Sequence, residues 1–319
     1  MADDTNPGAL VPLGLVQVRE PGARFLSNPD PAWVEAQKDW EYALLAQVAY
    51  SNIRGVRDTY FRRALIHLRL RKRDKDAPDP TTARKAVIDL CNAGWRPWED
   101  FPRGALLMQL NISHLRAEVW EKRIPPTIAV AFGGTVATSG KDWLSNLRWL
   151  IPIPFRKDEY TEVVTTLAPS FSAEYLKLSA EPDREHLRGA TLHSTGHSLG
   201  GGLAQQFAYA LPLHAARPRV THVYAFDSSP VTGYYSVDRA TRKANSKGLE
   251  TDRIYEKGEI LSYLRAGLRF FRPPSRINPA IREVRYDLFR ASNPIAGHSI
   301  TELASKIYEN RSLQLLEHR

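Results

Sequence analysis

A serine flanked by glycines, between a strand-like run and a helical run, constrains the fold of this chain most. Residues 196–202 read GHSLGGG; residues 190–195 before them predict a strand, and residues 199–211 predict a helix. A sharp turn from strand to helix brings Gly196 and Gly200 too close to the chain for a Cβ. It also exposes the Ser198 hydroxyl at a helix N-terminus, where amide N–H groups favour negative charge.

The rest of the chain alternates between the two kinds of element after residue 105. We expect strands at 106–112, 117–121, 127–132, 190–195, 220–226 and 253–255, and helices at 32–50, 58–70, 83–92, 143–150, 161–178, 199–211 and 299–309. Such alternation favours an α/β fold with a mostly parallel central sheet flanked by helices. Residues 1–30 predict an extended N-terminal arm, and residues 31–319 a single domain that begins with a helical segment.

The composition of the chain limits which partners it is expected to bind and in which cellular compartment it is expected to reside. The chain has 319 residues, a net charge of +9 and 43% hydrophobic residues, which excludes a largely disordered chain. Its single cysteine, Cys91, excludes an intrachain disulfide. The start has no signal-peptide pattern, and no run of 18 apolar residues predicts a membrane helix. We therefore expect a cytoplasmic protein by default, with secretion by another route left open, and an affinity for anionic surfaces.

The serine turn, VAFGGT at 130–135 and KDWLSNL at 141–147 together resemble the class 3 lipases, the fungal-type family of α/β-hydrolases. The resemblance runs from about residue 40 to 305. It implies an α/β-hydrolase fold and a serine hydrolase that cleaves lipid esters through an acyl-enzyme. One departure is Gly133, which stands where the family usually has Arg and so lacks a packing and charge anchor behind the following loop.

A serine nucleophile needs a histidine base that is oriented by a carboxylate, and α/β-hydrolases place them in the order Ser, acid, His. His298 is the expected base, because it lies late in the chain, on a loop just before a predicted helix. For the acid, the segment RIYEKGEILSYL resembles the acid segment of the family and puts Glu259, in place of the usual Asp, at that position. Asp227, directly after the strand at 220–226, remains the alternative acid.

Two amide groups are expected to form an oxyanion hole. The first belongs to Leu199, directly after the nucleophile; the resemblance gives Thr135 as the second. Residues 141–155 carry an amphipathic apolar stripe. In the resembling family this segment is a lid that opens at lipid interfaces, and the alternative is a helix that simply packs on the sheet.

The expected function is hydrolysis of lipid esters, as a triacylglycerol lipase or esterase acting at an interface. A phospholipase that acts on anionic membrane lipids is the alternative, favoured by the net charge and a basic stretch at 62–75. That stretch includes Asp74 and matches no nucleic-acid module, so we expect no nucleic acid as partner. A non-catalytic binding protein with the hydrolase fold is a third possibility. We expect no metal or cofactor, because His193 and Ser198 are not at a zinc-ligand spacing and no Lys-Ser/Thr follows Gly202 as in a phosphate loop.

Overall fold

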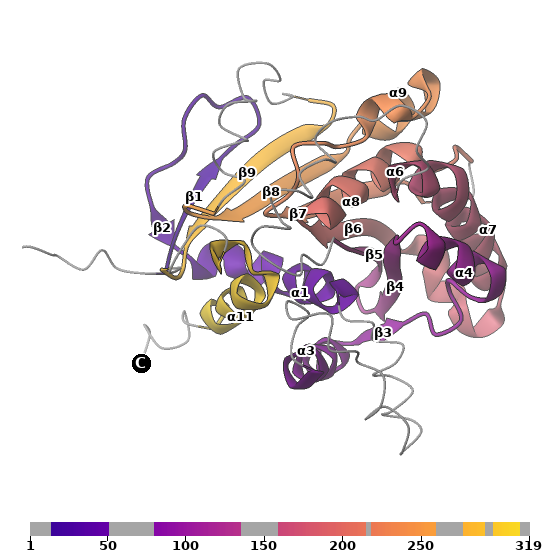
Figure 1. The fold of residues 1–319 in the computed structure, drawn as a ribbon, viewed down its shortest axis with the longest axis horizontal. Coiled ribbons are helices and arrows are strands. Elements are labelled where there is room, and N and C mark those ends of the chain that lie inside the picture. The colour runs from indigo at the N-terminus through magenta and orange to yellow at the C-terminus, as the bar shows by residue number, and fades with distance from the viewer. Residues whose placement is uncertain are drawn as a thin grey trace, which may run out of the picture.

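The computed structural model describes residues 14–50, 80–134, 159–214, 218–259, 277–290 and 296–312. Its centre is a nine-stranded sheet in the order β2-β1-β9-β8-β7-β6-β5-β4-β3 (Figure 1). The strands are β1 Leu15–Arg19, β2 Asp30–Pro31, β3 Trp95–Pro97, β4 Arg116–Arg123, β5 Pro126–Gly133, β6 Thr191–His197, β7 Val220–Phe226, β8 Glu250–Glu256 and β9 Ala280–Asp287.

The prediction of an α/β fold with a central sheet is confirmed, and the prediction of a mostly parallel sheet is confirmed in part. Neighbouring strands from β5 to β9 run parallel, whereas β4, β3, β1 and β2 pair antiparallel at the two edges. The turn Ile124–Pro125 explains one of these edges, because two residues can join antiparallel strands, whereas parallel ones need a long crossover.

Helices cover both faces of the sheet (Figure 1). Two hydrophobic clusters form the core: one lies between the sheet and α8 with α7, the other between the sheet and α1 with α11 and α3. The helices are α1 Trp33–Tyr50, α3 Pro80–Asn92, α4 Gly104–Ile112, α6 Glu159–Glu162, α7 Ala168–Ser179, α8 Leu199–Ala210, α9 Arg239–Ser246 and α11 Ile300–Asn310. A π-helical turn, Val163–Leu167, joins α6 to α7, and short 3₁₀ segments lie at Pro182–Gly189, Tyr234–Ser236 and Ala296–His298.

The predicted strand at 106–112 is wrong, because these residues belong to helix α4. The apolar alternation there does not correspond to a buried face: Leu110 is buried, but Met108 is 66% and Ile112 79% exposed. Ala, Leu, Met and Gln dominate the segment and are good helix formers. The sequence pattern does not predict β9, because the charged residues Arg282, Glu283 and Arg285 interrupt its apolar alternation.

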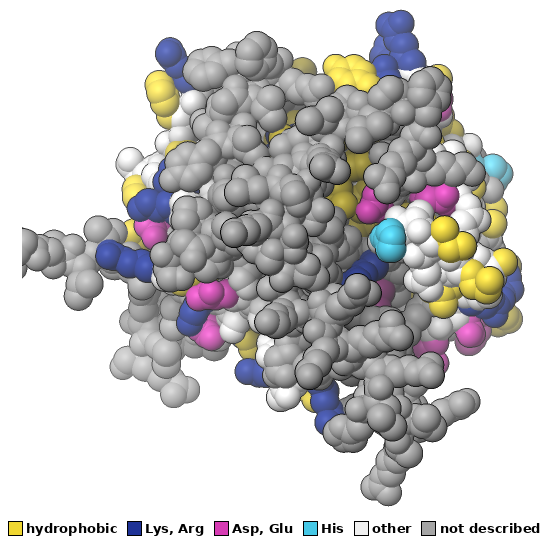
Figure 2. Space-filling model, viewed as in Figure 1, with side chains coloured by type: hydrophobic (Ala, Val, Ile, Leu, Met, Phe, Trp, Pro, Cys, Tyr) yellow, Lys and Arg dark blue, Asp and Glu magenta, His cyan; other side chains and the backbone are white. Residues whose placement is uncertain are grey.

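Several predictions lie outside the described residues, namely the helices at 58–70 and 143–150 and the basic stretch at 62–75. Within the predicted arm, Leu15–Arg19 is extended but pairs with β9. Among the described residues, no helix combines the length and apolar character that crossing a bilayer requires. Figure 2 shows described Lys and Arg side chains scattered over one face, with Asp and Glu among them.

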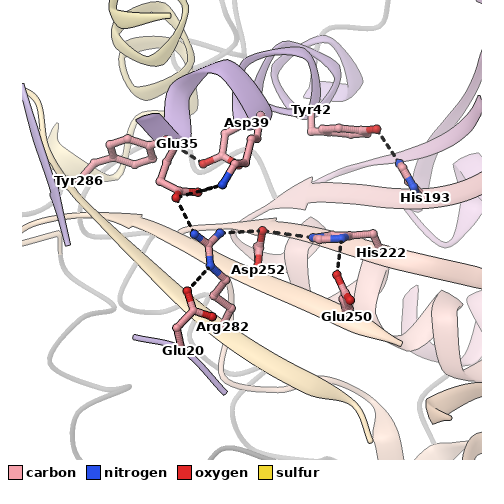
Figure 3. A network of polar contacts seen from close by, with 11 residues as sticks. Glu20, Glu35, Asp39, Tyr42, His193, His222, Glu250, Asp252, Arg282 and Tyr286 are labelled. Carbon is pink, nitrogen blue, oxygen red and sulfur yellow. Dashed lines mark hydrogen bonds and ion pairs between the residues drawn. The ribbon is translucent and has the colours of Figure 1, made fainter. Parts of the chain in front are cut away.

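A chain of polar contacts fastens α1 to the sheet (Figure 3). Glu35 of α1 pairs with Arg282 of β9 at 2.6 Å, and Arg282 also contacts Asp252 of β8 at 3.4 Å. The Tyr286 hydroxyl donates to Asp39 of α1 at 2.7 Å, and burial raises the pKa of the Asp39 carboxyl well above its usual value. These contacts set the position of α1 and therefore of its last residue, which reaches the site described next.

Candidate active site

Ser198 occupies the sharp turn between β6 and α8 that its flanking glycines predict. Its φ of +57° is rare for a residue with a side chain, and its amide donates to the carbonyl of Phe226 at 3.0 Å. A Cβ on Gly196 would lie 2.3 Å from the Gly200 carbonyl oxygen, and one on Gly200 would lie 2.4 Å from that of Phe132. The chain can therefore make this turn only with glycine at both positions.

His298 hydrogen-bonds Ser198 on one side and Glu259 on the other. Its Nε2 lies 3.0 Å from Ser198 Oγ, and its Nδ1 lies 3.1 Å from Glu259 Oε2. Glu259 is fully buried, whereas Ser198 and His298 each keep 9% of their surface exposed. A serine, a base and a carboxylate in this order form the arrangement that activates a hydroxyl as a nucleophile.

The three side chains come from segments that follow the carboxyl ends of parallel strands. Ser198 follows β6, and Glu259 lies just beyond β8, where Gly258 turns the chain at a φ of +82°. His298 ends a 3₁₀ turn, and Ser299 then caps α11 by accepting a hydrogen bond from the amide of Glu302 at 3.4 Å. In open parallel sheets, binding and catalytic sites commonly lie at the carboxyl ends of the strands.

The alternative acid, Asp227, lies next to the same site but makes different contacts. It is completely buried after β7, and its Oδ1 accepts the amide N–H of Glu256 at 3.2 Å. Its Oδ2 faces His197 Nε2 at 3.7 Å. Because the Nδ1 contact of His298 is made with Glu259, the geometry favours Glu259 over Asp227 as the partner of the base.

Tyr50, the last residue of α1, lies at the site although no sequence pattern predicts it there. Its hydroxyl donates to the main-chain carbonyl of His197 at 3.0 Å and lies 2.9 Å from Nδ1 of the same residue. Burial raises the pKa of the Tyr50 phenol, so it keeps its proton at neutral pH. No local signal marks Tyr50, because it lies 147 residues away from His197 in the chain.

The space beside Gly133 is filled from two other elements. A Cβ at Gly133 would lie 2.5 Å from the carbonyl oxygen of Ala49 in α1, so the fold as it stands has no room for a larger side chain. Arg116 of β4 is the strand partner of Gly133, and its guanidinium donates to the Tyr50 carbonyl at 2.9 Å. The end of α1 and Arg116 thus pack where the resemblance led us to expect a missing anchor.

The predicted oxyanion-hole residues are only partly within the described structure. Leu199 is the first residue of α8, so its amide lies among the N–H groups of a helix start that have no partner within the helix. Thr135 and the predicted lid at 141–155 lie outside the described residues. Their proposed roles stay predictions.

Fold and site together define an α/β protein with a buried, hydrogen-bonded Ser-His-Glu arrangement at the carboxyl ends of its parallel strands. No protein-family model matches the chain, and no curated protein matches it by sequence. Among solved structures, the chain is similar to Rhizomucor miehei lipase in its propeptide complex, with a TM-score of 0.44 and 15% identity over 78% of this chain and 67% of that chain. It is also similar to lipase II from Rhizopus niveus, with a TM-score of 0.41 and 18% identity over 75% of this chain and 77% of that one.

Both of these solved structures carry the name of a lipase. These similarities are distant, and the activity proposed for the chain rests on the geometry of its own side chains.

Proposed function

We propose that this protein is a serine hydrolase that cleaves carboxylic esters of lipids, as a triacylglycerol lipase or esterase. The observation that supports this proposal best is the position of His298, which bridges the Ser198 hydroxyl and the buried Glu259 carboxylate. The strained backbone of Ser198 adds support, because such strain persists where the surrounding structure holds a reactive group in place.

In the proposed reaction, Ser198 Oγ attacks the ester carbonyl while His298 Nε2 accepts its proton. Glu259 holds the Nδ1 proton of His298 and stabilises the imidazolium that forms. The imidazolium then protonates the leaving alcohol, which leaves an acyl group on Ser198. Water, deprotonated by His298, attacks that acyl group and releases the carboxylic acid.

The negative charge on the carbonyl oxygen needs amide donors in the transition state. We assign this role to the amide of Leu199, which begins α8, and to that of Thr135. Each donor is expected to contribute about 3–4 kcal/mol to transition-state stabilisation.

A phospholipase reaction by the same residues is the second candidate, because the net charge of +9 favours anionic lipid surfaces. In that case the protein binds its lipid substrate at an interface, through peripheral contact with an anionic membrane. A non-catalytic binding protein of the same fold would need neither the Ser198–His298 contact nor the strained turn.

Hydrolysis of p-nitrophenyl esters from acetate to palmitate, by the wild type beside Ser198→Ala, tests the proposal. We expect release by the wild type that rises with acyl chain length and is reduced by a factor on the order of 10⁶ in Ser198→Ala. A fluorophosphonate probe should label the wild type and not the variant, whatever ester the enzyme prefers. Equal labelling of both proteins, or equal release by both, would contradict the proposal.

Vesicles separate the two lipid substrates. Release of fatty acid from triolein emulsions but not from phospholipid supports the lipase. Hydrolysis of phosphatidylglycerol vesicles that exceeds that of phosphatidylcholine and declines with added salt supports the phospholipase, because salt screens the attraction.

A further inference from the structure

Two buried polar atoms face each other beside the Ser-His-Glu arrangement. His197 Nε2 and Asp227 Oδ2 lie 3.7 Å apart, which is longer than a hydrogen bond. Within the described part of the chain, neither atom has a hydrogen-bond partner. His197 is 3% exposed and Asp227 is fully buried, so bulk water does not readily compensate either atom.

The contacts of Tyr50 lead us to assign the proton of the His197 ring to Nδ1. The Tyr50 hydroxyl has a single proton and donates it to the His197 carbonyl at 3.0 Å. With that proton on the carbonyl, we assign the Nδ1 proton to the 2.9 Å contact between His197 Nδ1 and the tyrosine oxygen, which then acts as acceptor. A neutral His197 therefore presents the lone pair of Nε2 to a carboxylate oxygen. Two acceptors that face each other in a buried site are compensated by a proton between them or by a bound cation.

His298 lies close enough to His197 and Asp227 to act as a third ligand. The ring of His298 lies against that of His197 with 4.6 Å between ring centroids. One ligand atom from each of His197, Asp227 and His298 can be chosen so that all three lie within 4.8 Å of one another. Zinc binds imidazole nitrogen and carboxylate oxygen at roughly 2.0–2.2 Å, so its ligand atoms lie roughly 3.3 Å apart in a tetrahedral site. The cluster would contract modestly on binding.

We propose that His197, Asp227 and His298 form a binding site for a divalent transition metal, with Zn²⁺ as the best fit, and that the bound ion inhibits the hydrolase. Two imidazoles and one carboxylate are ligands that Zn²⁺ prefers, and three protein ligands leave a fourth position for water. The Tyr50 hydroxyl contacts Nδ1 of His197 and so orients its ring, as hydrogen-bond partners of the ligands do in zinc sites.

Inhibition follows from the two contacts of His298. Its Nε2 is used by Ser198 and its Nδ1 by Glu259. Whichever nitrogen the ion takes, one of these two hydrogen bonds is lost, so the ion and the assembled nucleophile exclude each other. The inhibitory part of the proposal rests on the proposed function, whereas the binding part does not.

Calorimetric titration of the full chain with ZnCl₂ measures binding without any substrate. We expect one site in the wild type and in Ser198→Ala, which has all three ligands but lacks the nucleophile. His197→Gln and Asp227→Asn should each raise the Kd by at least about 100-fold, because each removes a direct ligand. His222→Gln is the matched control, since His222 lies 3.4 Å from Glu250 and 3.2 Å from Asp252 in a second histidine–carboxylate cluster. This control should keep the site.

X-ray absorption on the zinc-loaded wild type needs no folded variant and should show two imidazoles with further oxygen ligands and no sulfur. The binding proposal is overturned if the wild type binds no zinc, if the spectrum shows fewer than two imidazoles, or if His222→Gln loses the site while Asp227→Asn keeps it.

Inhibition is measured on each protein relative to its own metal-free rate of fluorophosphonate labelling. Zinc should block labelling of the wild type, and a chelator should restore it, while Asp227→Asn should resist the same zinc concentration. Zinc binding without any effect on labelling would overturn the inhibitory part alone. Absence of labelling in metal-free wild type would instead count against the proposed function.

Discussion

The role of Glu259 can be tested by exchanging its carboxylate for an amide of the same size. Glu259 Oε2 lies 3.1 Å from His298 Nδ1, and the side chain is fully buried. In Glu259→Gln, an amide oxygen that faces Nδ1 keeps the tautomer but removes the negative charge that stabilises the imidazolium. An amide NH₂ that faces Nδ1 reverses the tautomer, so that Nε2 carries a proton and no longer accepts one from Ser198.

The expected loss is large because either orientation disables the base. Loss of the equivalent carboxylate charge in a serine triad lowers kcat by about 10⁴, which corresponds to about 5 kcal/mol in the activation barrier. The kcat of Glu259→Asp should lie between those of the wild type and Glu259→Gln. The aspartate side chain is shorter by about 1.5 Å, one carbon–carbon bond, which lengthens the 3.1 Å contact with His298 Nδ1 unless the backbone moves.

The assay is kcat on the best p-nitrophenyl ester, with circular dichroism to verify the fold of each variant. Asp227→Asn is measured alongside and should lose much less activity than Glu259→Gln. A Glu259→Gln variant that keeps more than a tenth of wild-type kcat would refute the role of Glu259. If Asp227→Asn loses more kcat than Glu259→Gln does, Asp227 is the acid.

Two further predictions concern stability. Gly200→Ala should lower the free energy of unfolding in urea by about 1–3 kcal/mol and abolish turnover, because the new Cβ would lie 2.4 Å from the Phe132 carbonyl oxygen. Glu256 lies buried with its Oε1 3.0 Å from the amide of Leu288, and burial raises the pKa of its carboxyl to about 8. The folded protein therefore keeps a proton that the unfolded chain releases between about pH 4.5 and 8, so stability should fall as pH rises through that window, and Glu256→Gln should flatten the decline.

Each of these has its own control. Gly189→Ala adds a Cβ with no atom within 4 Å, so it should leave the free energy of unfolding nearly unchanged; an equal loss in both glycine variants would refute the steric argument. For Glu256, the measurement is urea unfolding at several pH values between 5 and 8. The raised pKa of Glu256 would be contradicted if the free energy of unfolding of the wild type rises with pH. It would also be contradicted if that free energy falls as steeply with pH in Glu256→Gln as in the wild type.

The sequence by itself determined the local features of this protein. The glycines around Ser198 predict the turn, since the steric requirement acts within a few residues. An apolar β-branched run predicts β5, because burial on both faces leaves a continuous apolar stretch. The helix at 32–50 is confirmed as α1, and the one at 299–309 as α11. Local pattern failed at α4, where the alternating apolar residues do not form a buried face. It also failed at β9, whose Arg282 and Glu283 side chains form ion pairs with residues of α1 and β1.

Only the tertiary structure decided which distant groups meet. Glu259 and Asp227 both follow parallel strands, and the choice between them depends on a turn at Gly258 and on the path of the chain to His298. The same holds for Tyr50 against His197, which α1 brings together across 147 residues, and for the buried lone pairs of His197 and Asp227. Hydrogen bonds and charge contacts act over a few ångströms in space regardless of separation along the chain, so a local pattern can name the candidates, but the packing of α1 and the parallel strands selects among them.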